Sequence, residues 1–228
     1  DGVEPGFAFA ALPGHHRHGA EFIDEACRRG AVAVITDSEG QSIIARSAHG
    51  DFPMIVHDQP RPLVAHIAAI LVGFPTRSLT MIGVTGTNGK TSVCALLSAA
   101  LGAGDISCGV IGTLGSTLNG DQLASGPRTT PEAPDIQAMA RSMVDDGAEA
   151  IVMEVSSIAL SEHRVDGVVF DVAVFTGLSH DHLDYHETMD AYFAAKAELF
   201  TKERSRRGVV LIDDEWGERL ARGSVLPI

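Results

Sequence analysis

Basic residues, cysteines and long apolar runs are all scarce in this chain of 228 residues. Its 17 lysines and arginines face 30 aspartates and glutamates, which gives a formal net charge of −13. This is the wrong sign for a protein that follows the phosphates of a nucleic acid, so we expect no nucleic-acid partner. Any anionic ligand must be held locally, by a few basic residues and backbone N–H groups.

The cysteines Cys27, Cys94 and Cys108 are odd in number and lack the spacing of a metal or redox motif. They predict buried thiols in a reducing cytoplasm. The longest apolar stretch, LVAHIAAILVGF, is interrupted by His66 and predicts a packed helix, not a membrane span. Hydrophobic residues still make up 45% of the chain, which is enough for one large or two small cores. We therefore expect a globular protein. From its first residues we also expect no signal peptide and a natural start further upstream.

Short β-branched runs alternate with helical patterns along the chain. These runs are AVAVIT (31–36), PMIV (53–56), TMIGV (80–84), CGVI (108–111), AIVMEV (150–155), DVAVFT (171–176) and GVVLI (208–212). The alternation predicts an α/β fold with a mainly parallel sheet.

Capping residues and breaks divide the chain further. One predicted helix ends at Gly30, and another begins at Thr130 as N-cap, has Pro131 in its first turn and ends at Gly147. Glycine and proline in GFPTRSL (73–79) predict a boundary between a domain of residues 1–76 and a domain of residues 77–228.

The segment TMIGVTGTNGKTSVCALLSAAL combines an apolar strand, a glycine-rich turn and a helix that opens with Lys90 and Thr91. This is the setting of a phosphate-binding loop, although Val84 stands where the strict pattern has glycine. We expect Lys90 to reach the outer phosphates of a nucleotide and the Thr91 hydroxyl to hold Mg²⁺. The predicted nucleotide-binding residues are Thr85, Gly86, Thr87, Asn88, Gly89, Lys90 and Thr91. The alternative is a glycine-rich turn without a ligand.

Two further groups of polar residues follow predicted strands. Glu154 lies at the carboxyl end of a buried run, where it can complete a Mg²⁺ shell or simply be solvated. The segment LSHDHLDYH (178–186) contains His182 and His186, four residues apart as in some zinc sites. No cysteine or glutamate completes a zinc pattern, and a phosphate loop favours a hard cation. A polar capping loop is the other interpretation.

The segment YFAAKAELF (192–200) places Lys196 in the middle of an apolar helical stripe. Its stem can cross the stripe while the ammonium reaches water. The other interpretation is a buried neutral amine, which is a nucleophile able to take up CO₂ as a carbamate. Spacing leaves both interpretations open.

Taken in order, six segments resemble the Mur ligase family, and within it the MurE type. They are GVTGTNGKT, TTPEAPD, MEVSS, HRVDG, FTGLSHDHLDYH and YFAAKAELF, and the resemblance runs from about residue 6 to residue 217. It implies a small N-terminal α/β domain (1–76) that binds the UDP-muramoyl substrate and an incomplete P-loop ATP-binding domain (77–228). The family's C-terminal domain, which binds the amino acid, and the strand carrying its uridine-contacting serine are expected to be absent.

The resemblance implies an ATP-dependent amide ligase of peptidoglycan synthesis, and hence a role in cell shape and division. It would join meso-diaminopimelate or L-lysine to UDP-N-acetylmuramoyl-L-alanyl-D-glutamate through an acyl phosphate. Lys90 and Thr91 would serve ATP and a first Mg²⁺, while Glu154, His182 and carbamylated Lys196 (N6-carboxylysine) would hold a second. Because histidine is a poor ligand for so hard an ion, Mn²⁺ is expected to support the reaction too. A cytoplasmic monomer is expected.

The family's substrate contacts map onto two parts of this sequence. Those for the muramoyl peptide would be Arg128, Thr129, Thr130, Ser156, Glu162 and Arg164, and those for the uridine diphosphate would be His15, His16 and Arg17. The chain departs from the family at Ile158, where the family has histidine, and in LIDDEWG, which leaves adenine contacts near Asp213 and Asp214 open.

Three other functions remain compatible with part of this pattern. A folylpolyglutamate synthetase shares the ATPase domain, but TTPEAPD and the N-terminal domain argue against it. A metal-dependent P-loop phosphotransferase or hydrolase is what the motifs alone predict. A degenerate Mur-like binding protein is disfavoured, because a protein without catalysis has little reason to keep Lys196 in an apolar stripe.

Overall fold

A computed structural model describes residues 2–14, 16–126 and 128–228. The chain forms two compact units, residues 1–67 and 68–228, which are described separately. The division falls inside helix α3 (Pro60–Leu71), earlier than the boundary predicted after residue 76. The glycine and proline behind that prediction only end α3 before a short 3₁₀ helix, η2 (Pro75–Ser78).

The first unit is built on a parallel three-stranded sheet in the order β1–β2–β3. Its strands are β1 (Ala8–Ala10), β2 (Ala33–Thr36) and β3 (Met54–Val56), and its shorter helices are η1 (Gly19–Phe22), α1 (Ile23–Arg28) and α2 (Ser38–Ala45). Ile23, Val34 and Ile44 are buried between the helices and the sheet. Sequence analysis missed β1, because its three residues, AFA, include no β-branched side chain.

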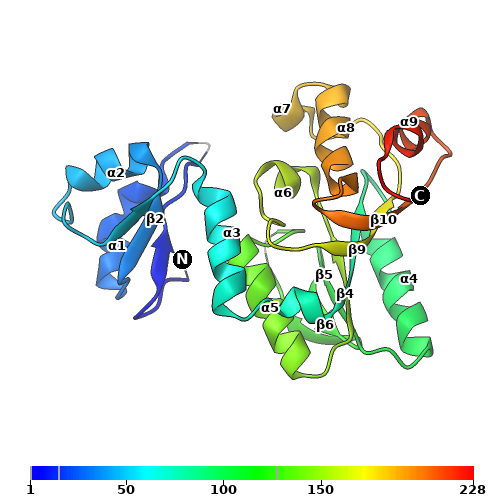
Figure 1. Cartoon of the computed structure of the whole chain (residues 1–228), viewed down its shortest axis with the longest axis horizontal. Helices are drawn as coiled ribbons and strands as arrows, with labels where there is room; N and C mark the ends of the chain where they lie inside the picture. Colours follow the sequence, from blue (N-terminus) through cyan, green and yellow to red (C-terminus); the bar gives the residue numbers. More distant parts are fainter. Residues whose placement is uncertain (1, 15, 127) are drawn as a thin grey trace. The chain divides into compact units, whose positions relative to one another are not determined.

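The second unit contains a seven-stranded sheet in the order β10–β9–β4–β8–β5–β6–β7. Figure 1 labels β4, β5, β6, β9 and β10 of this sheet. The strands are β4 (Thr80–Thr85), β5 (Cys108–Gly112), β6 (Gly115–Leu118), β7 (Asp121–Ala124), β8 (Ala150–Glu154), β9 (Phe170–Phe175) and β10 (Ser205–Val210). All neighbours are parallel except β5–β6 and β6–β7. Every strand predicted from the sequence is present, and the antiparallel hairpin β6–β7 was not foreseen.

Helices follow most of these strands. They are α4 (Lys90–Ala103), α5 (Ala133–Asp145), α6 (Ser157–Ser161), α7 (Leu183–His186), α8 (Met189–Ala197), η3 (Glu198–Phe200) and α9 (Glu215–Gly223). No helix within the described ranges is both long and apolar enough to cross a membrane.

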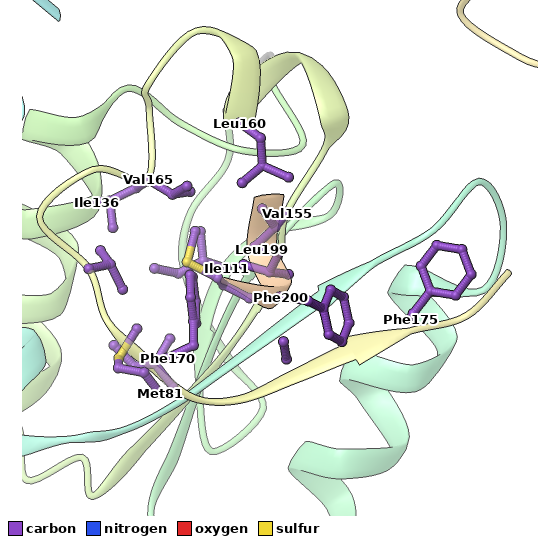
Figure 2. Packing of buried hydrophobic residues seen from close by; sticks show 14 of the residues in the cluster. Met81, Ile111, Ile136, Val155, Leu160, Val165, Phe170, Phe175, Leu199 and Phe200 are labelled. Atoms are coloured by element: carbon purple, nitrogen blue, oxygen red, sulfur yellow. The ribbon is translucent and has the colours of Figure 1, made fainter. Parts of the chain in front are cut away.

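Alternating side chains of the sheet enter two separate cores. The larger core receives residues of α5, α6, α8 and η3, among them Ile136, Leu160 and Leu199 (Figure 2). Ile151 and Met153 of β8 belong to the same core. Val152, between them in the chain, points to the opposite face and packs with Cys94 of α4. The same alternation sends Glu154 to the α4 face, since side chains along a strand have a period of two.

Cys94 and Cys108 are buried as predicted, whereas Cys27 is half-buried. Burial, with the negative charge of Glu154 as a smaller cause, raises the pKa of the Cys94 thiol to about 12. The thiol is therefore inert at neutral pH.

The predicted start of α5 is wrong. The helix begins at Ala133 with Glu132 as N-cap, not at Thr130. The Thr130 hydroxyl bonds the backbone around Glu154 instead, so it is unavailable as a cap. Gly147 follows the helix end with φ +86°, and Gly30 follows α1 with φ +91°, as expected of terminating glycines.

A candidate nucleotide and metal site

A glycine-rich loop joins β4 to α4 at the carboxyl edge of the sheet. Gly86 has φ +146°, and a Cβ added there would collide with the Thr176 hydroxyl oxygen. Thr176 Oγ1 lies 2.6 Å from the Asn88 carbonyl oxygen, and the Thr87 N–H donates to the Gly177 carbonyl at 3.0 Å. Thr176 and Gly177, which follow β9, therefore pack against the loop and bind its backbone. Only glycine at position 86 leaves room for this close packing.

The side chains of the loop are also anchored. Thr87 Oγ1 accepts from the Ser179 N–H at 3.0 Å and lies 3.2 Å from the Tyr192 hydroxyl. Asn88 Nδ2 lies 3.3 Å from Ser179 Oγ. Thr85 is fully buried and its carbonyl accepts from the Thr176 N–H at 2.9 Å, so it supports the loop from inside the protein and does not offer a surface to a nucleotide.

Two lysines donate to the same carbonyl oxygen of this loop. Lys90 Nζ lies 2.9 Å from both Gly86 O and Thr87 O, and Lys196 Nζ lies 2.8 Å from Gly86 O. Burial lowers the pKa of Lys90, while the nearby carboxylates of Glu154 and Asp181 act in the opposite direction.

Lys196 is 1% exposed, and its Nζ stands 4.6 Å from the centre of the Tyr192 ring. The interpretation in which its ammonium reaches water is therefore wrong. Burial, and next the positive charge of Lys90, lowers the pKa of Lys196 to about 7. Near neutral pH a large fraction of this amine is unprotonated.

Glu154 ends β8 with a carboxylate that is bound on both oxygens and 2% exposed. The Thr91 hydroxyl donates to Oε1 at 3.0 Å, and the Thr113 N–H donates to Oε1 at 2.9 Å. Thr113 Oγ1 donates to Oε2 at 3.2 Å. Gly112 makes room for this carboxylate, since a Cβ there would collide with Oε1.

A groove of about 700 Å³ lies between α4 and the strands β5 and β6, and Thr91 and Glu154 are among its lining residues. Both contribute oxygen atoms. A carboxylate and a hydroxyl 3.0 Å apart suit a hard cation such as Mg²⁺. The residues present thus fit the ion that the sequence predicts.

The two histidines of the predicted metal segment have different surroundings. His182 is exposed, has φ +50°, and its Nε2 lies 3.6 Å from Asp181 Oδ2. His186 is buried with its Nε2 2.9 Å from Ser157 Oγ, and burial lowers its pKa. Within the described ranges, no three histidine, cysteine, aspartate or glutamate side chains are placed to hold a metal. A zinc site made by His182 and His186 on one face is not supported.

Three of the predicted substrate residues meet beside Glu154. The Thr130 hydroxyl donates to the Glu154 carbonyl at 2.9 Å and accepts from the Ser156 N–H at 3.0 Å. Thr129 Oγ1 lies 3.1 Å from Thr113 Oγ1. Because Thr130 is 1% exposed, its side chain shapes this corner from inside.

The predicted arginines of this unit share one carboxylate. Glu132 Oε1 lies 3.2 Å from Arg164 Nε and 3.8 Å from Arg128 Nη1. Glu162 accepts from the Tyr185 hydroxyl at 3.1 Å.

In the first unit, Arg17 pairs with Glu21 at 2.7 Å, His16 is exposed, and His15 lies outside the described residues. His18 is the residue that sequence analysis missed here. Its Nδ1 accepts from the Ala20 N–H at 3.0 Å and its Nε2 lies 3.1 Å from Asp37 Oδ1.

The structure shows the surroundings of the two places where the sequence departs from the family pattern, the segment LIDDEWG and Ile158. Asp214 caps α9 by accepting from the Gly217 N–H at 2.7 Å, and its other oxygen accepts from the Leu178 N–H at 3.0 Å. Asp213 is exposed, and Ile158 is half-buried in α6. Asp214 therefore supports the loop after β9. Of the two aspartates, only Asp213 has an exposed side chain.

Comparison with family models matches residues 84–224 to the Mur ligase middle domain and residues 1–70 to the Mur ligase family catalytic domain. The chain is 47% identical over 226 residues to a UDP-N-acetylmuramoyl-L-alanyl-D-glutamate–2,6-diaminopimelate ligase of Streptomyces coelicolor, covering 99% of this chain and 44% of that protein. It is 44% identical over 220 residues to the protein of the same name from Pseudomonas aeruginosa, covering 96% and 44%.

Among solved structures, a UDP-N-acetylmuramoyl-L-alanyl-D-glutamate–2,6-diaminopimelate ligase superimposes with a TM-score of 0.78 at 28% identity, covering 97% of this chain and 43% of that one. MurF ligase from Thermotoga maritima in complex with ADP shares the fold, with a TM-score of 0.62 at 24% identity, covering 97% and 46%. The chain spans less than half the length of these relatives.

Proposed function

The chain belongs to the Mur ligase family, and from this premise we propose that it forms the nucleotide and muramoyl-peptide sites of an ATP-dependent amide ligase of peptidoglycan synthesis. The ligase joins a diamino acid to UDP-N-acetylmuramoyl-L-alanyl-D-glutamate in the cytoplasm. The names of the relatives at 47% and 44% identity favour 2,6-diaminopimelate as that amino acid.

One observation carries the proposal. A phosphate loop, a buried strand-end carboxylate and a buried lysine meet at one edge of the sheet, with Thr91 3.0 Å from Glu154 and Lys196 2.8 Å from Gly86 O. A simple nucleotide hydrolase needs the first two, but has no evident use for a fully buried lysine with its pKa near 7.

In the proposed reaction, the glutamate γ-carboxylate of the substrate attacks the γ-phosphorus of ATP, and ADP leaves. The acyl phosphate then loses inorganic phosphate to the attacking amine, which gives up a proton as the amide forms. Both partners of the first step are anions, so the chain must supply positive charge and orientation. Lys90, from the first turn of α4, and the loop N–H groups provide these for the phosphates.

Thr91 and Glu154 would hold Mg²⁺, which screens the negative charge of the phosphates when it is bound. We further propose that Lys196 reacts with CO₂. Its neutral Nζ forms the N–C bond as one C=O π bond of CO₂ opens, and the nitrogen releases one proton, which converts the neutral amine into a carbamate anion. His182 would join this carbamate and Glu154 at a second ion, after its exposed ring turns toward the loop, and Mn²⁺ would substitute for Mg²⁺.

The substrate side of the proposal rests on Thr129, Thr130 and Ser156 next to Glu154, and on Arg128 and Arg164. Since Glu132 lies between the two arginines, an anionic ligand would compete with it for their guanidinium groups. In the first unit, Arg17 and His16 are the proposed contacts for the uridine diphosphate.

The test is phosphate release from ATP by the longest natural chain that contains this sequence. Reactions receive UDP-N-acetylmuramoyl-L-alanyl-D-glutamate with meso-diaminopimelate, with L-lysine, or with neither. We expect turnover only with the uridine substrate and meso-diaminopimelate. Turnover that ignores both additions would instead support a phosphotransferase or hydrolase, and binding without turnover would support a degenerate family member.

A further inference from the structure

Thr113 occupies a position that no motif of the sequence marked. It directly follows β5, and the register Ile111↔Met153 between β5 and β8 brings it next to Glu154. Its N–H donates to Glu154 Oε1 at 2.9 Å, and its hydroxyl oxygen lies 3.2 Å from Oε2. One residue thus binds both oxygens of the carboxylate.

These two contacts fix the orientation of the carboxylate. The terminal torsion of a glutamate is broad, so an unsupported carboxylate samples many orientations. With Thr113 on both oxygens and the Thr91 hydroxyl also on Oε1, the plane of the Glu154 carboxylate is set before any ligand arrives. A preset ligand atom binds a cation more tightly than one that must first be ordered.

The neighbouring hydroxyl of Thr129 determines where the Thr113 proton goes. Thr113 Oγ1 lies 3.1 Å from Thr129 Oγ1 and 3.2 Å from the carboxylate. A hydroxyl has one proton, and its bond to an ionised acceptor is the stronger one. The Thr113 proton therefore faces Glu154, while its oxygen is left to accept a proton from Thr129.

We propose that Thr113 is a positioning residue that holds the Glu154 carboxylate in the orientation needed to bind the divalent cation beside the nucleotide. The inference rests on the proposed function for the nucleotide and for the cation that Thr91 and Glu154 would hold. Thr113 itself is exposed, so changing it removes the contact without opening a core.

The experiment compares the wild type with Thr113→Val, which has the same shape but no hydroxyl, and with Thr113→Ser, which keeps the hydroxyl. Thr80→Val, at the exposed first residue of β4 and away from the groove, is the matched control. Binding of ADP to the longest natural chain is followed by calorimetry while free Mg²⁺ is varied, and once in EDTA. Circular dichroism and melting curves check the fold, and Thr113→Ala replaces the valine variant should the latter not fold.

For Thr113→Val we expect about a fivefold rise in the half-saturating Mg²⁺ concentration, which converts to roughly 1 kcal/mol. The hydrogen bond is only partly buried, so water can replace part of it, which keeps the effect modest. ADP affinity in EDTA, the serine variant and the Thr80→Val control should all stay within about twofold of the wild type. An unchanged Mg²⁺ requirement in the valine variant would overturn the inference, as would an equal loss in EDTA. ADP binding by the wild type is measured before any variant is compared. A wild type that does not bind ADP would refute the proposed function instead.

Discussion

The buried ammonium of Lys196 offers the sharpest test of the structure. The substitution Lys196→Met keeps a straight, flexible stem in the apolar stripe of α8 and removes the charge. Because the amine is 1% exposed and surrounded by Tyr192 and the loop, we expect this variant to be more stable than the wild type and inactive in the proposed reaction.

The size of the effect follows from the pKa of the lysine, which falls from 10.5 in a free side chain to about 7 in the folded protein. Each pKa unit corresponds to about 1.4 kcal/mol, so burying the protonated form costs about 5 kcal/mol. The hydrogen bond that Lys196 donates to Gly86 O returns about 1 kcal/mol. At pH 7 about half of the buried amine is already neutral, which lowers the cost below that of the fully protonated form, so we expect Lys196→Met to gain roughly 3 kcal/mol in unfolding free energy.

The sign of the pH dependence is also determined. Between the folded pKa and the unfolded pKa of 10.5, the unfolded chain binds more protons than the folded chain. The wild type therefore gains stability as the pH rises, by about 2 kcal/mol from pH 7 to pH 9. The methionine variant lacks this contribution, so the difference between the two proteins should shrink by that amount.

Urea unfolding at pH 7, 8 and 9 in CO₂-free buffer measures this difference, and CO₂ is excluded because a carbamate would add a charge that the comparison does not include. Taking the difference between the two proteins removes the titrating groups that do not interact with Lys196, whereas Lys90 and His186, which do, stay in the comparison. A gap that stays constant with pH, or a methionine variant less stable than the wild type at pH 7, would show that the ammonium is not buried as described.

Two further substitutions test the supports of the loop. Gly86→Ala should lower the melting temperature and abolish the ADP binding measured by calorimetry, because the new Cβ collides with Thr176. Gly102→Ala, in open space on α4, should leave ADP binding unchanged and leave the melting temperature unchanged or slightly higher. Asp214→Ala should cost about 1 to 2 kcal/mol in urea unfolding, since Asp214 caps α9 and also accepts from the loop after β9. Asp213→Ala, at an exposed position, should be neutral within about 0.5 kcal/mol, and an equal loss in both variants would contradict the capping role.

Local patterns were sufficient for most of the parallel strands and for the loop that dominates the site. The strands from β2 to β10 that carry β-branched runs, the terminating glycines after α1 and α5, and the phosphate loop before α4 all depend on residues close in sequence. Antiparallel β6 and β7 were missed because their sequences, GSTL and DQLA, are short and largely polar.

The partners of the site residues depended on contacts between distant segments. Thr130 looked like a helix cap, but its hydroxyl bonds the backbone of Glu154 and Ser156 across the sheet. His182 and His186 shared a helical spacing, yet one is exposed and the other packs on Ser157. Thr113 carried no local signal at all, because its contact with Glu154 depends on the register between β5 and β8.

The sequence by itself thus determined the α/β alternation, the phosphate loop and the family to which the chain belongs, because these are encoded in periodicity and in short runs of residues. It could place Lys196 on an apolar stripe but could not tell whether its ammonium reaches water. Only the tertiary structure decided this, since solvent exclusion at Lys196 requires Tyr192 and the loop at Gly86 to close around it. Burial of a charge depends on every segment that packs against it, and residues 86 and 196 become neighbours only when the sheet has formed.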